Sequence, residues 1–328
     1  MIEERLIRAM ADRTMAYPFK VWGFGEGIAL EALWEAAEQL RMPLYREFVL
    51  ECLERWLARP IQEADHSTPG MLLLIAYQHT GDARYLERAL ALAEHMARLP
   101  TDPSGAAFHR PEHPDYHHYL YVDCMEVDAP FLCQLAIVTK EHTYFDRAVD
   151  QISSYCRLLQ DEATGLFYHQ YNGETEQVNG AFWGRGNGWA LLGLLKTLTV
   201  LPVEHAGYAA LKRHFERLAQ ALVARQLPSG GWPTVLDRAE TYQEASLPAM
   251  FGYGMQCGIA HGLLAPVYRD AVERARTAMT ARLTDGLLEG VSVATPPGDA
   301  AHYHAIPTGS GFPWGQGPAL LFALAQGS

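Results

Sequence analysis

Apolar residues recur at helical spacing along almost the whole chain, in segments of two kinds. Six segments begin at a small residue and are apolar on nearly every side. Between them lie six segments that have one apolar and one charged face. A helix that is apolar all round is buried, whereas an amphipathic helix borders solvent. The pattern therefore predicts six inner and six outer helices.

The inner segments start about 40 to 70 residues apart, a spacing typical of repeat architectures. They start at Gly27, Gly70, Ala129, Gly188, Ser246 and Gly315. The outer segments cover residues 2–15, 44–58, 84–99, 144–159, 208–226 and 268–283. We expect an all-α fold, an (α/α)6 barrel, in which residues 1–328 form a single toroidal catalytic domain.

Four related loops follow outer segments, with the sequences DPSGAAFHR, DEATGLFYHQYN, LPSGGWPTVLD and TDGLLEGVSV. Each predicts a turn with glycine at the helix C-terminus and then a short extended piece. These loops belong to the long outer-to-inner links 100–128, 160–187, 227–245 and 284–314. In an antiparallel ring, the long links all fall on the face where the inner helices begin. Long structured loops often carry function, and helix N-termini favour anions.

Composition and charge exclude several classes of protein. The formal net charge is -12 and no basic run is present, which argues against a nucleic-acid partner. The five cysteines form no CxxC pair, so neither a zinc ribbon nor a disulfide framework is indicated. The N-terminus lacks an apolar signal-peptide region, and no run of 18 apolar residues occurs, so we expect no membrane partner and a soluble cytoplasmic protein.

The stretch NGAFWGRGNGWALLGLL, residues 179–195, is the strongest candidate for a ligand site. Trp183, Arg185 and Trp189 lie just ahead of an apolar helical run, and the glycines between them permit sharp turns. Ring faces and a cation would then gather at a helix N-terminus. The alternative is a glycine-rich loop whose tryptophans only fill the core.

Two aspartates precede inner segments in adjacent repeats: Asp65 lies five residues before Gly70, and Asp123 six residues before Ala129. We expect their carboxyl groups side by side at the mouth of the ring. Two carboxyl groups that share a partly desolvated pocket favour one of them keeping a proton near neutral pH. The alternative for each is helix capping.

Further polar candidates lie on the long links. His169 should point into the mouth, or else be a hydrogen-bonded residue of the rim, and Glu244 either touches substrate or caps the fifth inner helix. The link 100–128 is rich in histidine, including the pair His113 and His117 with HxxxH spacing. Prolines interrupt any helix there and no further ligand completes a shell, so we expect no catalytic metal. No serine-nucleophile or nucleotide motif occurs.

Several motifs together resemble glycoside hydrolase family 105, the unsaturated rhamnogalacturonyl hydrolases, which is related to the family 88 unsaturated glucuronyl hydrolases. They are FWGRGNGW, ATGLFYHQYN, YVDCMEVDAPFL, SGGWPTVLD...YQEASLPAMFGYG and GSGFPWGQGPALLFALA. The resemblance covers residues 22–325, nearly the whole chain. The fold of that family is an (α/α)6 barrel, the architecture that the helical pattern predicts.

The resemblance implies hydrolysis of a 4,5-unsaturated uronic acid from the non-reducing end of oligosaccharides that polysaccharide lyases release. In that reaction an acid protonates C4, water adds at C5, and the hemiketal collapses to an open-chain keto sugar, without a cofactor. Matched to the family motifs, Asp123 would be the acid and base, and Asp65 would hold sugar hydroxyls beside it. The residues matched to substrate positions are His169, Trp183, Arg185, Trp189 and, approximately, His109.

Two other functions stay open from the sequence. An epimerase of the N-acylglucosamine type would need paired histidine bases at the mouth, and His169 has no clear partner. A carbohydrate-binding toroid without catalysis is the second alternative. The polysaccharide of origin, with rhamnose as the family's usual leaving sugar, and the oligomeric state are not determined by the sequence.

Overall fold

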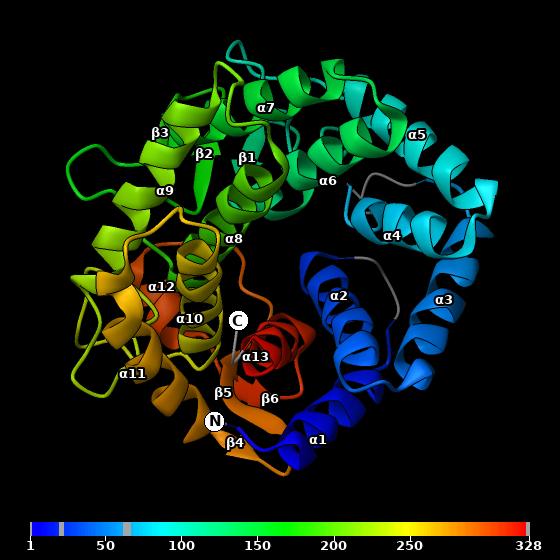
Figure 1. Ribbon diagram of the computed structural model, residues 1–328. Coiled ribbons are helices and arrows are strands. Elements are labelled where there is room, and N and C mark those ends of the chain that lie inside the picture. Colours follow the sequence, from blue (N-terminus) through cyan, green and yellow to red (C-terminus); the bar gives the residue numbers. More distant parts are fainter. Residues whose placement is uncertain (1, 20–22, 62–66, 326–328) are drawn as a thin grey trace.

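The helices are arranged as two concentric layers around a common axis (Figure 1). The computed structural model describes the chain except residues 1, 20–22, 62–66 and 326–328. The inner layer consists of α2 (Phe24–Gln39), α4 (Gly70–Thr80), α6 (Cys124–Thr139), α8 (Gly184–Val200), α10 (Ser246–Ala260) and α13 (Pro313–Leu324). The outer layer consists of α1 (Glu4–Met15), α3 (Pro43–Leu57), α5 (Ala83–Ala97), α7 (Thr143–Leu159), α9 (Tyr208–Val223) and α11 (Arg269–Thr280). The predicted (α/α)6 barrel is confirmed.

Four inner helices begin earlier than we predicted, and α2 is one of them, with its start at Phe24 rather than Gly27. Helix α6 starts at Cys124 rather than Ala129, α8 at Gly184 rather than Gly188, and α13 at Pro313 rather than Gly315. The prediction placed each start at the small residue next to the apolar run. Small residues instead occur inside these helices, because neighbouring backbones approach closely there. Asp123 and Trp183 therefore stand at the N-caps of α6 and α8.

Glycines permit the closest contacts within the inner layer. A Cβ atom at Gly193 of α8 would collide with the backbone of Met125 in α6. A Cβ atom at Gly317 of α13 would lie 2.7 Å from the Cα atom of Ala29 in α2. The second contact joins the last inner helix to the first, so it closes the ring.

The four predicted glycine turns are present, but their glycines do not lie at the C-termini of the outer helices as we predicted. Gly105, Gly165, Gly230 and Gly286 all have positive φ. Each lies several residues beyond its outer helix, within a tight antiparallel turn such as the one that pairs Gln160 with Phe167. The glycines are therefore turn residues of short hairpins and not helix C-caps.

Two small sheets lie on the long links. The first consists of β1 (Tyr119–Tyr121), β2 (Gln170–Asn172) and β3 (Gln177–Val178), all antiparallel, with Tyr119 opposite Asn172 and Tyr121 opposite Gln170. The second consists of β4 (Leu283–Thr284), β5 (Leu287–Ser292) and β6 (Thr308–Ser310), and the short helix α12 (Ala300–Ala305) precedes β6. The first sheet joins the link before α6 to the link before α8, whereas the second lies within the single link before α13.

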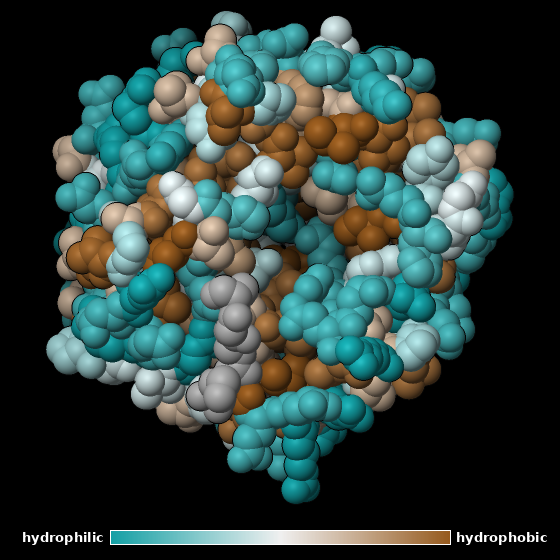
Figure 2. Space-filling view, viewed as in Figure 1, coloured by the Kyte–Doolittle hydropathy of each residue, from teal (hydrophilic) through white to brown (hydrophobic). Residues whose placement is uncertain are grey.

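The surface in Figure 2 is mostly hydrophilic around the outer rim, with hydrophobic residues visible toward the ring centre, where the molecule is hollowed. This distribution matches the amphipathic outer and apolar inner helices. Within the described part of the chain, no helix combines the length and apolar character needed to cross a bilayer.

Candidate active site

Two adjoining cavities lie where the inner helices begin, and Asp123 lines both of them. One cavity, of about 360 Å³, is lined by His109, Arg110, Tyr116, Tyr121, His169 and residues 294–297. The other, of about 270 Å³, is lined by Tyr17, Glu26, Trp183, Arg185, Trp189, Thr295, Trp314 and their neighbours. One cleft is therefore formed by the N-terminal ends of four inner helices: the start of α2, the N-caps of α6 and α8, and the first turn of α13. The long links predicted that functional residues would gather on this face.

Asp123 does not cap its helix. Its side chain makes no capping hydrogen bond to α6, and it is 14% exposed, with Oδ2 lying 3.2 Å from Nε2 of His169. Oδ2 is buried, and the angle to His169 falls outside hydrogen-bond geometry, so the contact is one of charge and proximity. A buried carboxylate oxygen without a hydrogen bond is costly and marks a functional position. The capping alternative for Asp123 is wrong.

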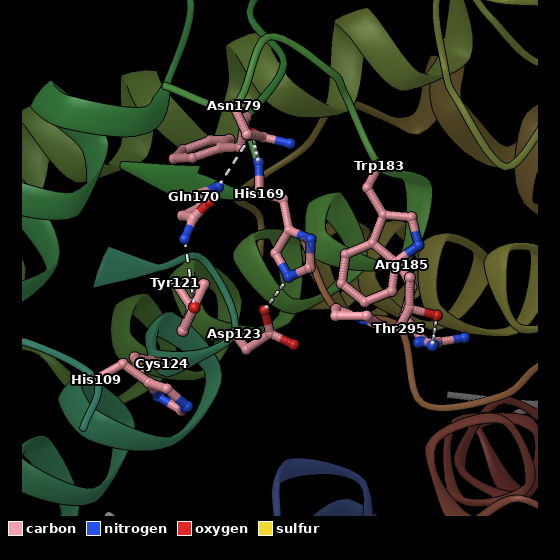
Figure 3. Close-up of polar contacts among 12 residues, drawn as sticks. His109, Tyr121, Asp123, Cys124, His169, Gln170, Asn179, Trp183, Arg185 and Thr295 are labelled. Carbon is pink, nitrogen blue, oxygen red and sulfur yellow. Dashed lines mark hydrogen bonds and ion pairs between the residues drawn. The ribbon is translucent and has the colours of Figure 1, made fainter. Parts of the chain in front are cut away.

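His169 is held from three sides, as the close-up in Figure 3 shows. Its backbone carbonyl accepts a hydrogen bond from the N–H of Val122, and its own N–H donates to Oδ1 of Asn179. Its ring stacks on Trp183 with centroids 4.2 Å apart, and its Nδ1 lies 2.8 Å from the hydroxyl of Tyr303. The pairing of β1 with β2 brings it beside Asp123, because Asp123 follows β1 and His169 precedes β2.

Tyr303 of α12 determines the tautomer of His169. Its hydroxyl accepts hydrogen bonds from Nδ2 of Asn179 at 2.9 Å and from the N–H of Gly298 at 3.1 Å. Burial raises the pKa of Tyr303 well above its usual value, so the phenol is neutral. Its one proton is left to donate to Nδ1 of His169, which places the imidazole proton on Nε2, facing Asp123.

Arg185 is buried between two tryptophan rings. Its guanidinium lies 4.7 Å from the ring centroid of Trp183 and 5.6 Å from that of Trp314. Nη1 donates to Oγ and O of Ser292, and Nη2 donates to Val293 O and Thr295 Oγ1. Burial lowers the pKa of Arg185, although the charges of Glu244 and Asp123 oppose this. The cation thus fixes the segment after β5 and brings one positive charge to the wall of the second cavity, beside the carboxyl groups of Glu26 and Asp123.

Glu244 supports Arg185 from beneath the cleft. It is 1% exposed, and its Oε1 lies 3.4 Å from Nη1 of Arg185 and accepts the N–H of Ser292. Its Oε2 accepts the N–H and Oγ–H of Ser246, the first residue of α10. Glu244 is not among the residues lining either cavity, so of the two predicted roles the structure favours the one at the helix start.

The remaining predicted residues are placed as follows. His109 is buried and packs edge to face on Tyr121, with Nδ1 3.6 Å from Sγ of Cys124, and it lines the larger cavity. Trp189 is 2% exposed and lines the smaller one. Asp65 lies outside the described residues, so its pairing with Asp123 stays a prediction.

Sequence reasoning missed Tyr303, Asn179, Tyr121, Thr295 and Trp314. Asn179 opens the stretch that we singled out, yet only the contact with α12 reveals what its amide does. The epimerase alternative required a second histidine beside His169. In the structure, His169 faces Asp123 and Tyr303 instead.

Comparisons with known proteins agree with this architecture. Residues 3–326 match the model of a family described as Glycosyl Hydrolase Family 88. The chain is 27% identical to the unsaturated rhamnogalacturonyl hydrolase YesR of Bacillus subtilis, over 98% of this chain and 95% of that protein.

Solved structures share the fold. A Family 105 glycoside hydrolase of C. acetobutylicum ATCC 824 superimposes with a TM-score of 0.88, at 24% identity and with 98% of this chain and 99% of that chain covered. The unsaturated glucuronyl hydrolase of Bacillus sp. GL1, described as responsible for the degradation of glycosaminoglycan, gives a TM-score of 0.74 at 19% identity, covering 99% and 97%. The resemblance stated from the sequence is confirmed. With nearly its whole length matched by the family model, the chain is a glycosidase and belongs to Glycosyl Hydrolase Family 88.

Proposed function

We propose that this enzyme removes a 4,5-unsaturated uronic acid from the non-reducing end of oligosaccharides by hydrating the vinyl ether, with Asp123 as the acid and base. The observation that carries the proposal is the position of Asp123. It lines both cavities, has a buried oxygen without a hydrogen bond, and faces an N–H of His169. YesR acts on an unsaturated rhamnogalacturonyl substrate by its name, which supports the same substrate class here.

The positioned imidazole assigns different tasks to the two oxygens of Asp123. Nε2–H of His169 faces Oδ2, so the proton that an acid delivers to C4 would be carried on Oδ1. After protonation, the carboxylate would take a proton from the water that adds at C5. The hemiketal then opens to a ketone at C5, the hemiacetal left at C1 collapses to an aldehyde and releases the other sugar as an alcohol, and an open-chain keto sugar remains.

The two cavities fit the two sides of the scissile bond. The smaller cavity combines aromatic rings with the positive potential of Arg185 and of helix N-termini, which suits a planar, negatively charged uronate. Both guanidinium Nη atoms already donate to the protein, so we propose that Arg185 attracts the carboxylate by charge and not through a free fork. The larger cavity, with His109 and Tyr116, would hold the leaving sugar, with rhamnose as the first candidate.

The experiment follows the ultraviolet absorbance of the conjugated enol-ether carboxylate while the protein acts on lyase-generated disaccharides. We expect the absorbance to fall, and Asp123→Asn to reduce kcat by at least about 100-fold, the usual contribution of a general acid. Asp115→Asn, an exposed aspartate on the same link, is the matched control and should keep full activity. Constant absorbance with pectic, algal and glycosaminoglycan fragments alike would contradict the proposal.

Four further expectations also remain proposals. They are a single catalytic domain over residues 1–328, a cytoplasmic location, the absence of nucleic-acid and membrane partners, and a supporting role for Asp65 beside Asp123 at the mouth of the ring. A double variant tests the last of these. If Asp65 acts with Asp123, then Asp65→Asn should lower kcat in the wild type and have little further effect in Asp123→Asn.

A further inference from the structure

A second cluster of polar side chains lies at the end of the β1–β2 pair that is far from Asp123. His117 and His118 come just before β1, Glu174 follows β2, and the pairing of Tyr119 with Asn172 brings the two ends together. Within the described residues, these three are the group of potential metal ligands whose donor atoms all lie within 4.8 Å of one another. The cluster touches neither Asp123 nor His169.

The donor atoms form a compact triangle. Nδ1 of His118 lies 3.0 Å from Nε2 of His117, and Oε1 of Glu174 lies 3.7 Å from each of these nitrogens. A point equidistant from the corners of such a triangle is about 2.0 Å from each, which is the length of a Zn–N or Zn–O bond. An ion at that point would lie in the plane of the three donors, and a shift of less than about 1 Å out of the plane would give the pyramidal geometry that a fourth, water ligand needs.

The second nitrogen of His117 is already engaged in the way that metal-bound histidines require. Nδ1 of His117 lies 2.8 Å from the carbonyl oxygen of Pro114, to which it donates its proton. The proton on Nδ1 makes Nε2 of His117 an acceptor, which faces Nδ1–H of His118 at 3.0 Å, and a metal ion would take the place of that proton. A hydrogen bond from the distal nitrogen to a backbone carbonyl is the usual second contact of a histidine ligand, and it fixes both tautomer and ring orientation.

We propose that His117, His118 and Glu174 bind a Zn²⁺ ion at the outer end of the β1–β2 pair. Two imidazoles and one carboxylate suit zinc, whereas Mg²⁺ and Ca²⁺ prefer sites made of oxygen ligands. Water would complete a tetrahedral shell, because His117 and Glu174 are 46% and 63% exposed. The site shares His117 with the pair His113 and His117, for which we expected no catalytic metal, but His113 is not part of it.

The ion would join the turn after β2 to the segment 113–118. That segment carries Tyr116, which lines the larger cavity, and its backbone runs into β1 and Asp123. Zinc would thus hold the outer wall of the cleft in place without taking part in the reaction. Its binding can therefore be tested without substrate.

The test titrates chelator-treated protein with Zn²⁺ by calorimetry at pH 7.5, with Mg²⁺ and Ca²⁺ as comparison ions. We expect one Zn²⁺ per chain and an affinity at least about tenfold lower in His118→Ala and in Glu174→Gln, because each loses a ligand. His113→Ala is the matched control, since His113 lies on the same exposed segment but outside the triangle, and it should bind like the wild type. The affinity should also fall at pH 5.5, because zinc binds deprotonated ligands.

Thermal unfolding supplies a second measurement. Zn²⁺ should raise the Tm of the wild type and of His113→Ala, because a ligand that binds only the folded state stabilises it, and should leave the Tm of His118→Ala unchanged. Without metal, all the variants should unfold at nearly the same temperature, since the substituted side chains lie at the surface. Absence of zinc uptake by the wild type, or uptake that survives both His118→Ala and Glu174→Gln, would overturn the proposal.

Discussion

Tyr303 decides which nitrogen of His169 carries a proton, although it is 134 residues away in sequence. The sequence offered no sign of this, because α12 is a short helix inside a long link and has no apolar periodicity. His169, Trp183 and Asp123 were predictable because unusual polar and aromatic residues cluster ahead of apolar runs. The partners that orient them come from other links, and only the folded chain brings them together.

Replacing Tyr303 with phenylalanine tests this orientation. Tyr303→Phe removes the proton donor to Nδ1, so the imidazole is free to place its proton on either nitrogen. We expect kcat to fall about 10- to 100-fold while KM changes little, as for other orienting partners of a histidine. The pH profile of kcat should change as well, which a purely structural role would not cause.

Tyr45→Phe is the matched control for that measurement. Tyr45 is also buried, and its hydroxyl donates to Asp12 on the outer layer, far from the cleft. Tyr45→Phe should lose about 1.5–3 kcal/mol of stability because its acceptor is a carboxyl group, and Tyr303→Phe should lose at least as much because Asn179, Gly298 and His169 each lose a partner. Equal kinetic effects of the two substitutions would show that Tyr303 acts through stability alone.

At the scale of single elements, the type of each helix was easier to predict than its ends. The outer helices were recognised from their charged faces, and α7 and α9 begin within one residue of the predicted positions. The start of α6 was misplaced by five residues because the prediction began each inner helix at its small residue, which is Ala129 here. Asp128 is buried in the first turns, where it accepts a hydrogen bond from Ser67 of the preceding link. Tertiary contacts of this kind override local signals.

The hairpin turns after the outer helices allow a test at single glycines. A glycine in such a turn has different surroundings from a glycine that ends a helix. Gly230 has a φ of +83°, and a Cβ atom there would collide with the carbonyl oxygen of Arg274. Gly81, which ends α4, has a φ of +73°, and a Cβ atom added there would have no neighbouring atom within 4 Å. Gly81→Ala should therefore cost about 1–2 kcal/mol from backbone strain alone.

Gly230→Ala should cost more than Gly81→Ala, because the backbone of α11 must also move. Urea unfolding of both variants measures the difference directly. A loss of stability in Gly230→Ala no larger than in Gly81→Ala would mean that the hairpin yields easily, contrary to its tight packing against α11.

At the scale of the whole molecule, one lysine connects three inner helices, of which α2 and α8 are not neighbours in the ring. Nζ of Lys196 in α8 contacts both Glu126 of α6 and Glu31 of α2, the latter at 2.5 Å. Burial raises the pKa of Glu126 to about 7, although Lys196 opposes the shift. Burial alone would lower the pKa of Lys196, but the charges of Glu126 and Glu31 outweigh it and raise the value. Near neutral pH, the cluster thus tends toward one cation, one carboxylate and one carboxylic acid.

The cluster predicts a pH dependence of stability. The pKa of Glu126 rises from 4.5 to about 7 on folding, so the folded state binds the proton more tightly. Its contribution to the free energy of unfolding is fully present below pH 4.5 and is lost as pH rises through about 7. Glu126→Gln mimics the protonated form and should flatten this part of the stability profile, measured by denaturant unfolding across that range.

Lys196→Met serves as the contrasting variant. It leaves two carboxylates facing each other in the interior without a cation, which should destabilise the protein by about 3–5 kcal/mol. If Glu126→Gln lowered the free energy of unfolding at neutral pH as much as Lys196→Met does, Glu126 would have to be mainly a carboxylate there. Assigning the proton of the cluster to Glu126 would then be wrong.

The contact of Gly317 with Ala29 has a consequence for how the protein is made. Helix α2 leaves the ribosome nearly three hundred residues before α13, which covers its apolar side. Translation at roughly 5–20 residues per second leaves that surface exposed for tens of seconds. The nascent chain must therefore be shielded from aggregation for most of its synthesis, and folding of the ring is completed only after translation of α13.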